Sequence, residues 1–138
     1  RYLTDLVSHA LVQSRGTAQI QTRGGAKAAR LQAIINDIQT SCVDPTLRAS
    51  TTAARLGLTP RYVHLLLEET GQTYSEHLCD HRLRFAGRML AKDSQGATKV
   101  SDIAYECGFS DVSYFNRMFR QRYGVSPTEY RLQVRLSR

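Results

Sequence analysis

One pattern occurs twice in this sequence, and this repeat constrains the fold more than any other feature. Ala53 and Gly57 match Ala104 and Gly108 at an offset of 51 residues, and the apolar residues that follow match at an offset of 52. Glycine in such a position ends a helix, because it adopts a positive φ without strain. Each copy predicts two short helices joined by a tight turn, so we expect an all-α fold with two similar subdomains.

The second copy shows the pattern most completely. Its first helix is predicted by an apolar stripe at the spacing i, i+3, i+4 and i+7, made of Val100, Ile103, Ala104 and Cys107. Thr98 is available as the N-cap of this helix, and Gly108 ends it. Ser110 is then placed to cap a second helix.

That second helix has two different faces. Its apolar face consists of Phe115, Met118, Phe119 and Tyr123. Its other face carries Val112, Ser113, Asn116, Arg117 and Arg120. Such a face suits the major groove of DNA, where a guanidinium group pairs with guanine and an amide pairs with adenine. The alternative is a solvated face on a small helical bundle, but the glycine turn, Ser110 and the short spacing argue against it.

Periodicity also predicts the remaining helices. Leu31, Ile34 and Ile38 belong to one helical stripe, which stops before Asp44-Pro45 because proline restricts the preceding residue. Residues 73–93 are predicted to form one long helix between the two copies. At 1.5 Å per residue its length is about 27–30 Å, close to the spacing of ~34 Å between successive turns of the major groove.

Each copy of the repeat is followed by a capping box, which predicts the start of another helix. Thr73 and Glu76 make one box, and Ser126 and Glu129 make the other, with Pro127 at the first helical position. A closing helix over residues 126–136 is therefore expected.

Charge and cysteine usage narrow the class of protein. Lys and Arg number 19 against 12 Asp and Glu, a net charge of +7 that favours an anionic partner. Cys42, Cys79 and Cys107 have no C-x-x-C spacing, so we expect reduced thiols in a cytoplasmic protein. No run approaches the ~18 apolar residues of a membrane span, and no membrane partner is expected.

Residues 1–26 differ from the rest of the chain. An amphipathic helix is predicted over residues 2–13; it is expected to pack on an upstream domain or a second subunit, or alternatively to fold back on this domain. Residues 14–26 contain three glycines and predict a flexible linker, so the folded domain is expected to span residues 27–138. A start at Arg1 rather than Met suggests a piece of a longer protein.

The stretch IAYECGFSDVSYFNRMFRQRYGVSPTEYR closely resembles the second helix-turn-helix of AraC/XylS-family transcriptional regulators. The likeness includes the Gly-Phe turn, the Tyr-Phe-x-Arg-x-Phe helix and the closing Gly-x-x-Pro-x-x-Tyr-Arg, and it extends back to about Leu31. It implies a homeodomain-like, AraC-type DNA-binding domain. Its first helix-turn-helix would span residues 46–71, its linker helix 73–93, its second helix-turn-helix 99–124 and its closing helix 126–136.

The resemblance also implies which residues face DNA. The base-facing candidates are Arg61, His64, Leu65, Val112, Ser113, Asn116 and Arg117, while Arg120 and Arg122 are expected at phosphates. The chain departs from the family at three positions. Leu65 stands where such regulators often carry a base-reading Arg, Thr52 replaces a core aliphatic residue, and Arg48 occupies the usual N-cap of the second helix.

We therefore expect a sequence-specific transcription regulator, rather than an enzyme, that reads two successive major-groove segments. Its residues leave open whether it is an activator or a repressor. Its expected partners are double-stranded DNA and RNA polymerase, with a small-molecule effector and dimerisation through an upstream domain. One alternative is the DNA-binding module of an alkyl-transfer repair protein, which an upstream four-cysteine cluster would indicate. Another is a module that contacts RNA polymerase instead of DNA.

No cofactor, catalytic group or metal is expected. His77 and His81 have a spacing that could hold a metal, with Cys79 and Asp80 nearby, but no fourth ligand is evident. We interpret both histidines as ordinary surface or bridging side chains.

Overall fold

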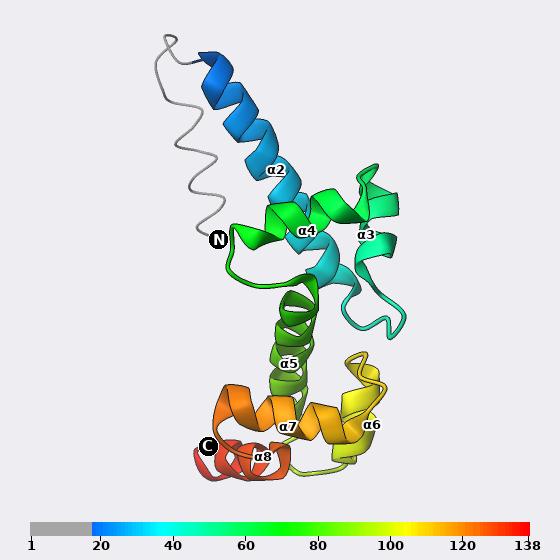
Figure 1. The fold of residues 1–138 in the computed structure, drawn as a ribbon. Helices are drawn as coiled ribbons and strands as arrows, with labels where there is room; N and C mark the ends of the chain where they lie inside the picture. The colour runs from blue at the N-terminus through cyan, green and yellow to red at the C-terminus, as the bar shows by residue number, and fades with distance from the viewer. Residues whose placement is uncertain (1–17) are drawn as a thin grey trace. The chain divides into compact units, whose positions relative to one another are not determined.

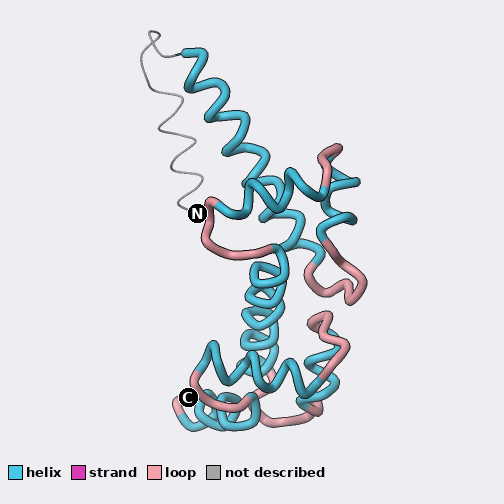
Figure 2. The backbone as a smooth tube through the Cα atoms, viewed as in Figure 1, coloured by secondary structure: helices cyan, strands magenta, loops and turns pink. Residues whose placement is uncertain are grey.

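The computed structural model describes residues 18–138, and every regular element in this range is a helix (Figures 1 and 2). The prediction of an all-α fold is confirmed. The helices, in chain order, are α2 (Ala18–Ser41), α3 (Ala49–Leu56), α4 (Pro60–Glu68), α5 (Tyr74–Lys92), α6 (Val100–Glu106), α7 (Val112–Tyr123) and α8 (Pro127–Leu136).

The chain divides into two compact units, each of which is built from two separate stretches of sequence. The first unit combines α2 up to Asp37 with Ala49–Tyr74, and the second combines Ile38–Arg48 with Ser75–Arg138. The first therefore holds the helix-turn-helix of α3 and α4, and the second holds that of α6 and α7.

The start of α2 differs from the prediction. Residues 18–26, expected as part of a flexible linker, are helical. Gly24 and Gly25 each cost about 1 kcal/mol relative to alanine in a helix, but the alanine, glutamine and arginine residues around them favour a helix. The glycines therefore weaken the helix without ending it. The predicted helix over residues 2–13 and the rest of the linker lie outside the described residues.

The core of the first unit contains a hydrogen-bonded threonine. Thr52 is fully buried, and its hydroxyl group lies 2.6 Å from Asp37 Oδ2 and 2.7 Å from the Tyr74 hydroxyl. Arg55 pairs with the same carboxylate at 3.1 Å. A buried hydroxyl destabilises a core unless it is hydrogen-bonded. These partners therefore explain how a threonine replaces an aliphatic side chain here.

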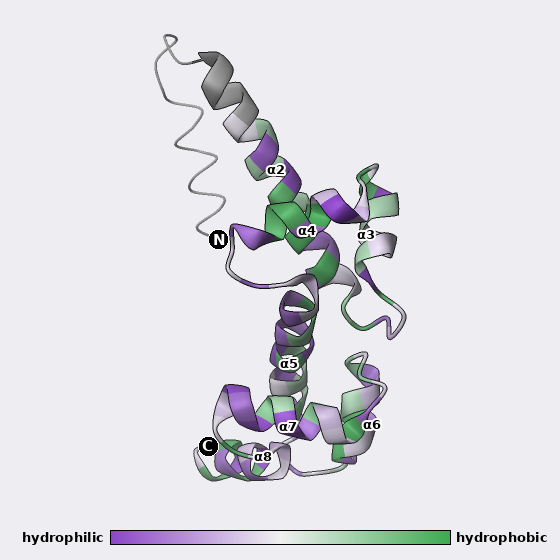
Figure 3. Ribbon diagram, in the orientation of Figure 1, coloured by the Kyte–Doolittle hydropathy of each residue, from purple (hydrophilic) through white to green (hydrophobic). Residues whose placement is uncertain are grey.

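The core of the second unit is aromatic. Phe115 and Phe119 on α7 are fully buried, as predicted, and their ring centroids lie 5.7 Å apart. Phe119 also stacks on Tyr123 at 4.4 Å and contacts the edge of Tyr130 of α8 at 5.4 Å. Apolar residues of α5 and α6 complete the cluster: Leu83, Ala86, Leu90, Ile103, Ala104 and Cys107. This packing holds one face of α7 inward, and apolar and polar residues are interspersed along its length (Figure 3).

The turn between α6 and α7 packs tightly against the segment that follows α2. Gly108 has a φ of +100°, and a Cβ atom there would lie 2.4 Å from the carbonyl oxygen of Cys42. Arg82 of α5 donates hydrogen bonds to the carbonyl oxygens of Cys42 at 2.7 Å and Asp44 at 2.8 Å. Its guanidinium group also lies 5.9 Å from the centroid of Phe109. Gly108 is thus required both by its backbone conformation and by this close approach.

Two predicted helix caps are wrong by one residue. Lys99, not Thr98, is the N-cap of α6, and it makes no side-chain cap. The backbone of Thr98 is held elsewhere: its N–H donates to Asp93 at 2.7 Å, and its carbonyl oxygen accepts from Arg131 at 2.7 Å. The hydrogen bond from the Thr98 N–H is the main reason why the pKa of Asp93 lies below its ordinary value.

The N-cap of α7 is Asp111 rather than Ser110. Its carboxylate accepts hydrogen bonds from the backbone N–H groups of Ser113 at 2.9 Å and Tyr114 at 3.2 Å. One carboxylate therefore satisfies two of the amides that a helix start leaves unpaired. The capping box of Ser126 and Glu129 is confirmed, whereas the box of Thr73 and Glu76 stays a prediction.

Truncation of Phe119 tests the packing of α7. Phe119→Ala should lower the free energy of unfolding by about 3–5 kcal/mol, because it removes a fully buried ring from the aromatic cluster. The melting temperature should then fall by about 10 °C or more. Leu132→Ala on α8 is the control, since Leu132 is exposed. Equal melting temperatures for both variants in circular dichroism would contradict this core.

Candidate nucleic-acid interface

α4 presents the three residues predicted for its reading face to solvent. Arg61, His64 and Leu65 are exposed, and Leu65 retains 54% of its accessible surface. The opposite side of α4 is buried, with Val63, Leu66 and Leu67 each at 1% exposure or less. Thr59 caps the helix through a hydrogen bond from the Tyr62 N–H, and Pro60 follows at the first position. Capping and burial together fix the rotation of α4.

α7 has the same division. Ser113, Asn116, Arg117 and Arg120 are exposed opposite the buried phenylalanines. Val112 differs, because it is half-buried and packs against the core of the second unit. Its side chain is therefore only partly available to a ligand.

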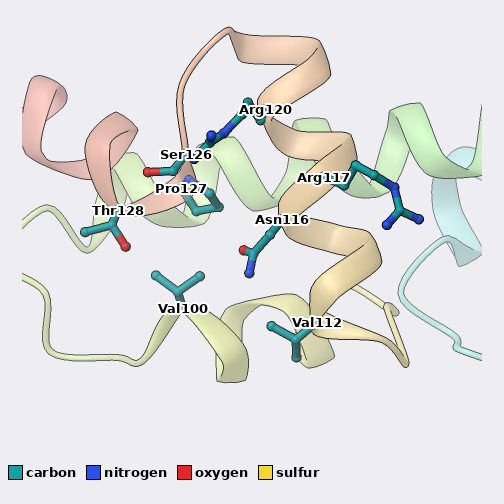
Figure 4. Close-up of a pocket in the computed structure, with 8 residues that line it drawn as sticks. All are labelled: Val100, Val112, Asn116, Arg117, Arg120, Ser126, Pro127 and Thr128. Carbon is teal, nitrogen blue, oxygen red and sulfur yellow. The ribbon is translucent and has the colours of Figure 1, made fainter.

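A hollow of about 550 Å³ lies beside this face of α7 (Figure 4). It is lined by the starts of α6 and α8 and by the outward side of α7, through Val100, Val112, Asn116, Arg117, Arg120, Ser126, Pro127 and Thr128. In Figure 4 the amide of Asn116 projects toward Val100 and Val112, whereas the guanidinium group of Arg117 extends away from the hollow. Asn116 and Arg117 thus present different donors in different directions from the same helix.

Arg117 stacks on its own helix. Its guanidinium carbon lies 5.5 Å from the ring centroid of Tyr114, a cation–π contact. No ion pair of Arg117 is found among residues 18–138. The contact orients the guanidinium group and leaves its N–H donors available.

Arg122, which was predicted to contact a phosphate, forms an ion pair within the second unit, and its phosphate contact stays a prediction. It pairs with Asp80 of α5, which also pairs with Arg84 at 2.9 Å. The prediction missed this pairing because the two residues lie 42 positions apart and periodicity gives no sign of it. Arg122 joins α7 to α5 through this ion pair, and Arg120 is the other exposed arginine in the last turn of α7.

The sequence analysis did not identify Tyr114 beside the exposed residues of α7, or Glu68 beside those of α4. Tyr114 is 37% exposed on α7 and supports Arg117. Glu68 lines a smaller hollow of about 290 Å³ together with His64. Two features of the sequence could have indicated them. Tyr114 is an aromatic residue next to the predicted base-facing residues, and Glu68 is an acidic residue four positions after His64.

His77, Cys42 and Cys107 are buried, and His81 and Cys79 are half-buried. In the described part of the chain, no group of three or more His, Cys, Asp or Glu side chains could hold a metal ion. Burial lowers the pKa of both His77 and His81, which favours their neutral forms. Cys42, Cys79 and Cys107 are free, and burial raises the pKa of Cys107 to about 12, so its thiol stays protonated.

None of the helices in residues 18–138 has the length and apolar content needed to cross a membrane.

Comparison with known proteins gives relatives that are regulators. A family model described as a helix-turn-helix domain matches residues 52–133. The transcriptional activator RhrA of Rhizobium meliloti is 42% identical over 74 residues, which are 54% of this chain and 23% of RhrA. The transcriptional activator NphR of a Rhodococcus species is 37% identical over 94 residues, which are 68% of this chain and 27% of NphR. The chain thus spans about a quarter of the length of these two relatives.

A solved structure shares the fold. It is a transcriptional regulator from Chromobacterium violaceum, described among proteins that contain an AraC-type DNA-binding domain. The TM-score is 0.67 at 22% identity, and the match covers 77% of this chain and 92% of that one.

Two neighbouring leucines test the rotation of α4. Leu65→Arg should change the free energy of unfolding by no more than about 0.5 kcal/mol, because Leu65 is exposed. Leu66→Arg should unfold the domain, because Leu66 is 1% exposed and a buried unpaired charge is strongly destabilising. Thermal melts of both variants measure the difference, and unfolding by Leu65→Arg would show that α4 is rotated.

Proposed function

Because this chain belongs to the AraC/XylS family of transcriptional regulators, we propose that it reads two successive major-groove segments of double-stranded DNA, one with α4 and one with α7. One observation carries the proposal. α7 is locked by the burial of Phe115 and Phe119, so its exposed side keeps Ser113, Asn116 and Arg117 together. A helix held in this way presents its donors to a groove without a further cost for ordering its backbone.

Each proposed contact follows from the chemistry of the side chain. Asn116 can bond adenine through both its amide donor and its acceptor, and Arg117 can bond guanine with two N–H groups. On α4, Arg61 and His64 supply the hydrogen-bond donors. Arg120 lies one turn beyond Arg117, so we assign it to a phosphate rather than to a base.

We also propose a role in transcription and an upstream domain. The named relatives are activators, which supports activation of transcription by this protein. Contact with RNA polymerase and a place in the cytoplasm are part of the same proposal. Because these relatives are much longer than the matched region, an effector-binding and dimerising domain upstream is consistent with them. The same relatives favour a regulator over an alkyl-transfer repair protein.

Salt dependence tests duplex binding. If Arg61, Arg120 and other exposed basic residues neutralise several phosphates, the binding constant should fall with salt at a log–log slope of about −4 to −7. Fluorescence anisotropy on a labelled duplex at several salt concentrations measures this slope. A flat response would contradict DNA binding and favour a module that contacts RNA polymerase alone.

Two arginines of α7 separate base reading from phosphate contact. On a duplex selected from a random library, Arg117→Ala should cost about 1–3 kcal/mol, with little effect on a scrambled duplex. Arg120→Ala should weaken both complexes about equally and make the salt slope shallower by about one.

Titrations of both variants on both duplexes at two salt concentrations give the comparison. An equal loss on the two duplexes for Arg117→Ala would remove Arg117 from the base-reading residues. A loss confined to the selected duplex for Arg120→Ala would reassign that residue to a base.

A further inference from the structure

We propose that Leu65 reads the 5-methyl group of thymine, and so gives the first helix-turn-helix a preference for thymine at one or two positions of its site. This inference rests on the proposed function, because it needs α4 to lie in a major groove. It assigns a chemical target to a side chain that can form no hydrogen bond.

The position of Leu65 is fixed by its helix. Leu65 is 54% exposed, while Leu66, the next residue, is 1% exposed. Val63 and Leu67 are also buried, so a rotation of α4 that covered Leu65 would expose these side chains. The Thr59 cap, at 3.1 Å from the Tyr62 N–H, fixes where the helix starts. The apolar side chain of Leu65 is therefore held outward.

The neighbours of Leu65 indicate what it contacts. Arg61 lies one turn before it and His64 immediately before it, and both are exposed. These donors suit the negative and acceptor-rich surface of a groove. A helix docked through them would bring Leu65, which shares their exposed side, against a neighbouring base edge. In the major groove the methyl group of thymine is the apolar feature that a base edge offers. Cytosine at the same place would present an amino group that leucine leaves unsatisfied.

Exposure of a leucine does not by itself indicate that it contacts DNA. Leu132 and Leu136 of α8 are 44% and 74% exposed, and single exposed apolar residues are common on protein surfaces. Leu65 differs from them because it stands on the helix that follows the turn, on the same exposed side as Arg61 and His64. Burial of one methyl group corresponds to about a fourfold change in affinity, which sets the size of the expected effect.

Replacement of thymine by deoxyuridine tests the proposal, since the two bases differ only in the methyl group. The 138-residue chain is first used to select a duplex from a random library. Each thymine of that duplex is then replaced singly by deoxyuridine, and affinity is measured by anisotropy. One or two replacements should weaken binding of the parent chain about fourfold, and should have no measurable effect on binding of Leu65→Ala.

Leu132→Ala is the matched control, because it also removes an exposed leucine but lies on α8. It should show the same losses as the parent chain, and circular dichroism should show all three proteins equally folded. If a selected duplex is bound but no replacement weakens the parent, or if Leu65→Ala shows the same losses, the inference about Leu65 is wrong while DNA reading stands. If no duplex is selected, the proposed function itself fails.

Discussion

The burial of Phe115 and Phe119 sets the direction of every other side chain on α7. Both rings are fully covered, and aromatic contacts with Phe109, Tyr123 and Tyr130 surround them. A helix with two buried rings on one side cannot turn about its axis without breaking this packing. The polar side is therefore positioned by residues that never touch a ligand. The geometry of the surface is a property of the core.

In the first unit, hydrogen bonds as well as apolar packing hold the helices in position. Its core includes the buried hydroxyl of Thr52, held by Asp37 and Tyr74, and Arg55 neutralises the carboxylate of Asp37. Such a network is directional, whereas an aliphatic side chain could pack in several ways. It ties α2, α3 and the start of α5 to one arrangement. α4 then packs on a support that polar as well as apolar contacts define.

Much of this arrangement follows from the sequence, and each prediction that was wrong has its own physical reason. The repeat, the buried faces and the glycine turns depend on the spacing of residues along one helix, so Phe119 and Gly108 were predicted correctly. The pairing of Arg122 with Asp80 depends on which helices meet, and local spacing carries no record of that. The caps at Lys99 and Asp111 were missed because two adjacent residues competed for one position. The start of α2 was missed because two glycines were weighed more heavily than the helix formers around them.

Arg82 has a consequence for how such a protein can be divided. Its two hydrogen bonds end on the carbonyl oxygens of Cys42 and Asp44, which come before the first helix-turn-helix in the chain but belong to the second unit. A cut before α5 would separate these partners and leave the guanidinium group and the Gly108 turn facing solvent. The two halves of the sequence repeat therefore cannot be exchanged as independent folding units. Recombination that swapped one half for a homologous half would have to carry the Cys42–Asp44 segment along with the distant helices that it supports.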